Sequence, residues 1–182
     1  MPAEETPNTN AVAVNPVTAT DVAAILRQRG WIASEPSPEQ NAWCERAALL
    51  LGSHAADRAG LADLLNLVFH YDASELLAKV DAHMVVSRYA ARDVLRGLAL
   101  LLLDGSPLTS DRFKEVVSSL KEDLELRGRE LFHPIRLALA GRAGEGELDR
   151  VILLLDEAAV LPFAIAVKPA RQRILEFCAA LD

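Results

Sequence analysis

The chain has 182 residues, a formal net charge of −7, and a composition that is 51% hydrophobic. A chain of this length can bury one sizeable core or two smaller ones packed together. The acidic balance argues against a protein that coats nucleic acid through bulk charge, although it leaves room for a local basic patch. The longest apolar stretch, around Leu98–Leu103, is far shorter than the roughly 20 residues of a membrane span.

The composition predicts an all-α fold. Leu and Ala dominate, and both lose little conformational freedom in a helix. The β-branched and aromatic residues that suit strands are scattered. Cys44 and Cys178 lie far apart and form no CxxC pair, so we expect free thiols in a cytoplasmic protein.

Residues that typically begin or end helices locate the first predicted elements. Residues 1–20 mix prolines, Asn, Thr and acids without helical period, which predicts a disordered N-terminal tail. A short helix follows from Asp21 and ends at Gly30, with Trp31 and Ile32 anchoring the turn. Ser37 before Pro38 is the order expected at the start of a second helix.

Further helices are predicted along the rest of the first half. The run Arg58–Phe69 has helical periodicity, and Asp72 with Glu75 resembles a capping box at the start of SELLAKV. We expect one long buried helix over Val85–Asp104, because this stretch is rich in Leu and stops at Gly105.

The second half begins at the Thr109/Ser110 cap with a helix that should end at Gly128, and it closes with a helix in ARQRILEFCAAL. We therefore expect two packed helical subdomains, at residues 21–105 and 106–182.

No catalytic or cofactor motif stands out. The four histidines lack HExxH-like spacing, LLDGSPL lacks the flanking glycines of a nucleophile elbow, and GRAGEGE has no Lys-Ser/Thr to complete a phosphate loop. The sequence therefore predicts a protein that is not an enzyme and that uses no cofactor and no metal.

The location of the charges is more informative than their total. Residues 1–104 hold 8 basic and 13 acidic side chains, whereas residues 105–182 hold 11 and 13. Seven basic residues fall in two short groups of the second half: Arg127, Arg129, Arg136 and Arg142, then Lys168, Arg171 and Arg173. Either these residues form a positive surface suited to a few phosphate contacts, or they pair with acids on neighbouring helices.

Several segments carry a family resemblance. GRELFHPIRLALAG, RAGEGELDRVILLL and VKPARQRILEFCAAL resemble, in order and spacing, the C-terminal end of bacterial glutamyl-tRNA synthetases. The upstream stretch from ERAALLLGSHA to DASELLAK resembles the preceding anticodon-binding subdomain. The resemblance covers roughly residues 21–182 and implies an α-helical cage. The chain departs from the family at Ala140, Gly146 and Val167, where threonine, proline and glycine are usual.

The resemblance implies a binding role rather than catalysis. Neither a His-Ile-Gly-His-like nor a Lys-Met-Ser-Lys-like motif is present, so the chain cannot by itself activate glutamate. We expect a free-standing module that binds a tRNA anticodon stem-loop, with tRNA-Glu as a candidate, and that assists a synthetase or a tRNA-modifying enzyme; membranes and DNA are not expected partners. The alternative is a protein-interaction or scaffold domain that kept the cage and lost the RNA.

The resemblance also assigns candidate RNA contacts. Pro134 would bend the chain and present Arg136 toward the RNA, where a guanidinium can stack on a base or hold a phosphate. The competing interpretation is a buried Arg136 that pairs with Glu130 or Asp149. The other candidates are the remaining members of the two basic groups, together with Arg58.

Overall fold

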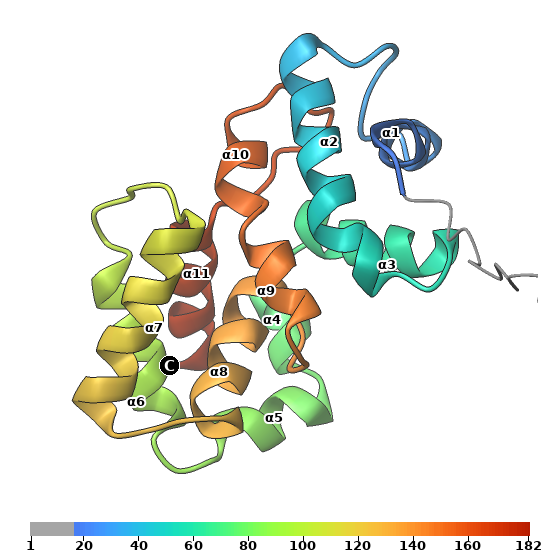
Figure 1. Cartoon of the computed structure of the whole chain (residues 1–182). Helices are drawn as coiled ribbons and strands as arrows, with labels where there is room; N and C mark the ends of the chain where they lie inside the picture. The colour runs from blue at the N-terminus through green and yellow to red at the C-terminus, as the bar shows by residue number, and fades with distance from the viewer. Residues whose placement is uncertain (1–16) are drawn as a thin grey trace, which may run out of the picture.

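The computed structural model describes residues 17–182, and within that range all regular structure is helical (Figure 1). The predicted all-α class is therefore confirmed. In chain order the elements are α1 (Ala19–Gln28), α2 (Pro38–Leu51), the short 3-10 helix η1 (Gly52–His54), α3 (Arg58–Phe69), α4 (Ala73–Leu77), α5 (Val80–Val86), α6 (Ala91–Leu101), α7 (Ser110–Leu124), α8 (Arg129–Ala140), α9 (Glu147–Ile152), α10 (Leu155–Ala159) and α11 (Ala170–Leu181).

Side-chain capping explains where five of the helices in residues 17–182 begin, namely α1, α2, α3, α4 and α7. The Ser37 hydroxyl accepts from the Gln40 N–H while the Gln40 side chain accepts from the Ser37 N–H, and Asp72 and Thr109 cap α4 and α7 in the predicted places. α1 begins at Ala19, two residues before the expected start, because Thr18 is its N-cap. Residues 1–16 of the predicted tail lie outside the described residues.

The prediction of a single helix over Val85–Asp104 is wrong. The chain breaks at Ser87–Ala90 into α5 and α6, and Ala90 takes a left-handed φ of 62°. Two short helices allow both buried faces to reach the core, since α5 and α6 each pack on α8 and lie on different sides of it in Figure 1. The helix expected to run to Gly128 also ends early, at Leu124, because Glu125 is left-handed.

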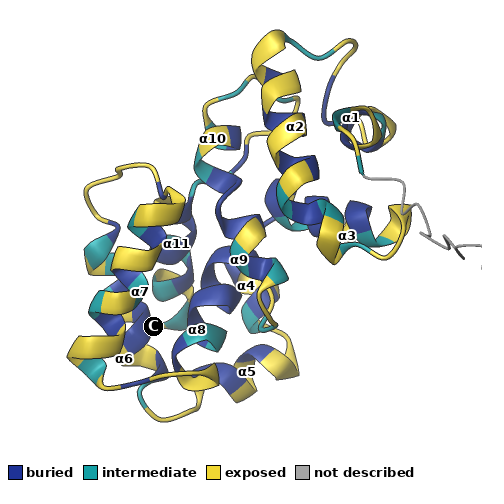
Figure 2. Cartoon of the chain, in the orientation of Figure 1, coloured by how far each residue is buried: buried dark blue, intermediate teal, exposed yellow. Residues whose placement is uncertain are grey.

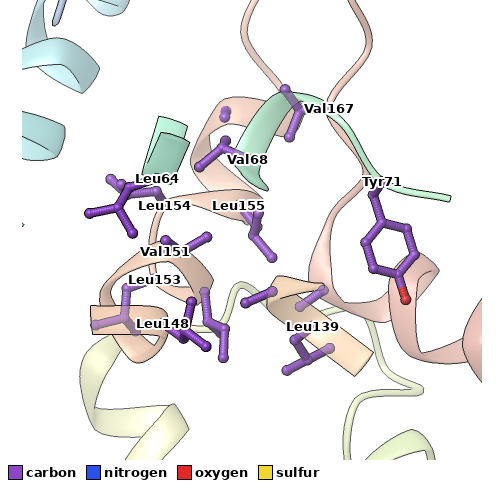
Figure 3. Packing of buried hydrophobic residues seen from close by; sticks show 14 of the residues in the cluster. Leu64, Val68, Tyr71, Leu139, Leu148, Val151, Leu153, Leu154, Leu155 and Val167 are labelled. Atoms are coloured by element: carbon purple, nitrogen blue, oxygen red, sulfur yellow. The ribbon is translucent and has the colours of Figure 1, made fainter. Parts of the chain in front are cut away.

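The core joins helices from both halves of the chain. α2 and α3 pack on α9, whereas α11 packs on α4, α6 and α8. The Trp43 indole N–H donates to the Leu154 carbonyl at 3.2 Å, and Leu64 and Val68 of α3 lie close to Val151 and Leu154 (Figure 3). Helices of the predicted subdomains 21–105 and 106–182 thus share one continuous hydrophobic cluster.

Burial follows the amphipathic pattern of each helix. Figure 2 shows dark, buried faces turned toward the middle of the helix assembly and exposed faces turned outward. None of the helices in residues 17–182 has the length and hydropathy of a membrane-spanning segment.

Candidate nucleic-acid interface

Arg136 faces the protein interior. Its Nε and Nη2 donate to the two carboxylate oxygens of Asp149 at 2.8 and 2.9 Å, and its Nη1 donates to the Gly144 carbonyl at 2.9 Å. The guanidinium lies 4.6 Å from the ring centroid of Phe132, and the Arg136 side chain is only 10% exposed. Such a bidentate pair fixes α8 against α9.

The proline does not turn this arginine outward. α8 runs without interruption from Arg129 to Ala140 with Pro134 inside it. Pro134 is the sixth of the twelve residues of α8, and its missing N–H leaves one intrahelical bond, to the Glu130 carbonyl, unmade. The expectation of a bend that presents Arg136 to RNA is therefore corrected. Of the two acids considered as partners, the structure selects Asp149 over Glu130.

Arg173 is fully buried and forms no ion pair with a carboxylate of residues 17–182. Its guanidinium donates to four main-chain carbonyls, those of Leu67, Val68, Leu139 and Lys168, at 2.6 to 3.0 Å. The first three belong to the last turns of α3 and α8, where the helix dipoles are negative. Burial lowers the pKa of Arg173 to about 10, so the side chain stays charged at neutral pH.

The remainder of the second basic group is also held by the protein. Lys168 pairs with Glu176 at 2.8 Å, and Arg171 donates to the Leu103 carbonyl at 2.9 Å. Of this group, Arg173 is buried, Lys168 is half-buried and Arg171 is exposed.

The first basic group is different, because Arg127, Arg129 and Arg142 are exposed. Arg129 has a distant contact with Glu145 at 3.9 Å, with both side chains largely in solvent. Such an exposed pair holds its cation weakly. Arg58, the remaining candidate, is exposed on α3 and lines a separate hollow with Asp21 and Asp57.

The structure brings Arg142 together with residues that sequence reasoning missed. A hollow of about 400 Å³ between α5 and α8 is lined by Lys79, Arg88, His133 and Arg142, and we call it the basic hollow. Asp81 is the acid among its lining residues, and Met84 and Leu137 supply apolar surface. The hollow therefore keeps an excess of positive charge.

His133 links the two sides of the basic hollow. Arg88 Nη1 donates to His133 Nδ1 at 2.8 Å, which requires an unprotonated Nδ1. Burial lowers the pKa of His133, and the nearby charges of Arg88 and Arg129 lower it further. A neutral His133 thus holds Arg88 in place across the hollow.

A second hollow lies on the other side of α8. It has a volume of about 430 Å³ between α7, α8 and α9, and we call it the α7–α9 groove. Its cations Lys114 and Arg150 are exposed, and Phe113 and Phe132 line its apolar part. Asp149 is its only acidic lining residue, and both Asp149 oxygens are occupied by Arg136.

The two hollows flank one ridge. Phe132 lines the α7–α9 groove and the next residue, His133, lines the basic hollow, so the first half of α8 separates them. Cations from α7, α8 and α9, and from the turns beside α5 and α8, surround this ridge. No sequence motif marks Lys79, Arg88, Lys114 or Arg150, because they come from elements far apart in the chain.

The described residues contain neither a cluster of metal-binding side chains nor a disulfide. Across residues 17–182, no three His, Cys, Asp or Glu side chains converge as metal ligands. Cys44 and Cys178 are free thiols, and burial raises the pKa of the Cys44 thiol to about 11. The arrangement around α8 is suited to holding an anionic polymer by side-chain charges.

Comparison with known proteins identifies the family of this chain. Residues 18–161 match the family model of the anticodon binding domain. A glutamate–tRNA ligase of Bacillus pumilus is 26% identical over 142 residues, covering 75% of this chain and 28% of the relative. Glutamate–tRNA ligase 2 of Syntrophus aciditrophicus is 35% identical over 80 residues, covering 44% of this chain and 16% of the relative.

A glutamate–tRNA ligase of Roseiflexus castenholzii is 31% identical over 127 residues, covering 66% of this chain and 24% of the relative. The chain thus spans at most about 28% of the length of these three relatives. No solved structure matches it. The resemblance read from the sequence is confirmed, and since the family model covers most of its residues, the chain belongs to the anticodon binding domain family, of the glutamyl-tRNA synthetase type.

Proposed function

We propose that this protein is a non-catalytic tRNA-binding module that engages an anticodon stem-loop through the ridge of α8 and the two hollows beside it. The observation that carries the proposal is the set of exposed cations around this ridge, on a chain that belongs to the anticodon binding domain family. The ligand named for the relatives makes tRNA-Glu the first candidate.

The physical basis is local charge on an acidic body. Phosphate contacts from a few positioned Arg and Lys side chains fix an RNA in register even when the net charge of the protein is negative. Lys79, Arg88 and Arg142 supply such contacts on one side of α8, and Lys114 and Arg150 supply them on the other. The net charge of −7 confines RNA to this positive area.

In this proposal Arg136 and Arg173 position the binding surface and do not touch the RNA. Arg136 fixes α8 to α9, and Arg173 joins the ends of α3 and α8. The RNA contacts fall to Arg127, Arg129 and Arg142 of the predicted set, together with the newly identified cations. The proposed module acts in the cytoplasm, in trans, beside a synthetase or a tRNA-modifying enzyme.

The test is a fluorescence titration of the protein with total tRNA and with tRNA-Glu at low and moderate salt. We expect Arg88→Gln and Arg142→Gln to weaken binding and each to reduce the slope of log affinity against log salt by about 1. Arg29→Gln is the matched control, because it removes one exposed charge at the end of α1, far from α8 in Figure 1. Absence of binding by the wild type at low salt would refute the proposal.

A second candidate function is a protein-interaction domain that kept the cage and lost the RNA. Three widely exposed apolar side chains favour it: Leu49 is 80%, Leu100 is 70% and Val160 is 81% exposed. A pull-down from the native cytoplasm tests this candidate. Recovery of RNA without a stable protein partner would count against it.

A further inference from the structure

Exposed apolar side chains lie on α5, which borders the basic hollow, and in the turn that follows it. On α5, Val80 is 74% and Met84 is 60% exposed, and in the turn after α5 Tyr89 is 89% exposed. Val80 and Met84 are four residues apart and so share one face of the helix. Met84 also lines the basic hollow together with Lys79, Arg88 and Arg142. Apolar and cationic side chains therefore occur side by side here.

The backbone around Tyr89 is held on both sides. Arg88 is tied to α8 through its 2.8 Å hydrogen bond to His133, and the N–H of Arg88 donates to the Val85 carbonyl. After Tyr89, the Ala90 carbonyl accepts from the Val94 N–H, and Ala90 has the left-handed φ of 62°. Non-glycine residues adopt that conformation rarely, so the turn is a specified feature. Its effect is to present the Tyr89 side chain to solvent from a fixed point.

We propose that Tyr89 is a stacking platform for an unpaired base of an RNA whose phosphates lie in the basic hollow, with Met84 extending the apolar contact. This inference rests on the proposed function and names the nucleotides that the surface selects. Every base has an apolar π-face, and that face is free only where the base is unpaired. A duplex offers this surface its phosphates alone. The structure thus selects single-stranded loops over paired stems of the same charge.

The cations decide between RNA and a protein as the occupant. Lys79, Arg88 and Arg142 outnumber Asp81 among the charged residues that line the hollow. An aromatic platform bordered by positive charges is the arrangement that proteins use for single-stranded nucleic acid. The exposed Leu49 of α2 lines the hollow of Arg58, where Asp21 and Asp57 outnumber the cation, and it therefore serves as a control.

The experiment measures the affinity of the wild-type chain and of three variants for two RNAs. One RNA is a hairpin with an unpaired loop, and the other is a fully paired duplex of the same length. We expect Tyr89→Ala to bind the hairpin about 5- to 10-fold more weakly. Its affinity for the duplex and its salt slope should equal those of the wild type. Leu49→Ala, which removes another exposed apolar side chain, should change neither affinity.

Tyr89→Trp supplies an independent readout. It keeps an aromatic face, so it should bind the hairpin as tightly as the wild type, and its emission should be quenched by the hairpin and not by the duplex. The two natural tryptophans, Trp31 and Trp43, are buried and give little background response. Urea unfolding of each variant checks that the exposed substitutions leave the fold intact.

The outcomes separate this inference from the proposed function. A wild type that binds neither RNA overturns both. A wild type that binds the hairpin while Tyr89→Ala binds it equally well overturns the stacking platform alone. Equal weakening of hairpin and duplex by Tyr89→Ala would also overturn it, because a stacking contact requires an unpaired base.

Discussion

The Arg136–Asp149 ion pair is predicted to stabilise the fold rather than to bind RNA. Its two hydrogen bonds are 2.8 and 2.9 Å long, and the side chains are 10% and 24% exposed. Removing one partner of a buried pair leaves the other charge unpaired and costs about 3 to 5 kcal/mol. Because Asp149 keeps some contact with water, we expect the lower end, about 3 kcal/mol, for Arg136→Ala.

A double-mutant cycle isolates the pair from the other contacts of Arg136. Arg136→Ala also removes the hydrogen bond to Gly144 and the contact with Phe132, and these losses cancel in the cycle with Asp149→Ala. Hydrogen bonds to charged groups contribute about 1.5 to 3 kcal/mol, so we expect a coupling energy of about 2 kcal/mol. The Tm of Arg136→Ala should fall by about 6 to 12 °C, at about 2 to 4 °C per kcal/mol.

The assay is urea unfolding followed by far-UV circular dichroism and by tryptophan fluorescence. The matched control is the exposed pair Arg129–Glu145, whose atoms are 3.9 Å apart and whose coupling should be near zero. A coupling energy for Arg136–Asp149 below about 0.5 kcal/mol would refute the reasoning. So would a stable Arg136→Ala variant that has lost tRNA binding, because that result would make Arg136 a direct contact.

Three further predictions concern side chains that are buried or whose pKa is shifted. Arg173→Met should lower the free energy of unfolding in urea by about 4 kcal/mol. Arg173→Lys should not restore stability, since an ammonium with three donors cannot satisfy four carbonyls. Wild-type stability in either variant would contradict this prediction. The pKa of His133 lies below its usual value of 6.5 in the folded state, so the unfolded chain binds the proton more readily and stability falls as the pH drops through this range. His133→Gln should therefore lose less stability than the wild type between about pH 7 and about pH 5, and equal losses in unfolding experiments would exclude this role. Burial raises the pKa of the Cys44 thiol to about 11, so Cys44 should react with a thiol reagent only after unfolding, whereas the less buried Cys178 should react in the native state. Mass spectrometry maps the labelled cysteines, and labelling of both in the native state would contradict the packing.

The sequence determined the helical class, the family and the starts of several helices. Ser37, Asp72 and Thr109 cap their helices as predicted, because each cap is a hydrogen bond to a backbone N–H only three residues away. Gly30 ends α1 with a φ of 73°, which is likewise a property of one residue and its neighbours. Such signals are contained in short stretches and can be read without a fold.

Only the tertiary structure decided how the basic residues are used. Arg136 and Arg142 belong to one predicted group, yet packing buries the first against Asp149 and leaves the second beside Lys79 and Arg88. The break at Ser87–Ala90 was likewise not predicted, because no Gly or Pro marks it and the left-handed residue there is Ala90. Whether a charged side chain is buried or exposed depends on which helices pack around it. That packing joins helices far apart in the chain and depends on the whole hydrophobic core.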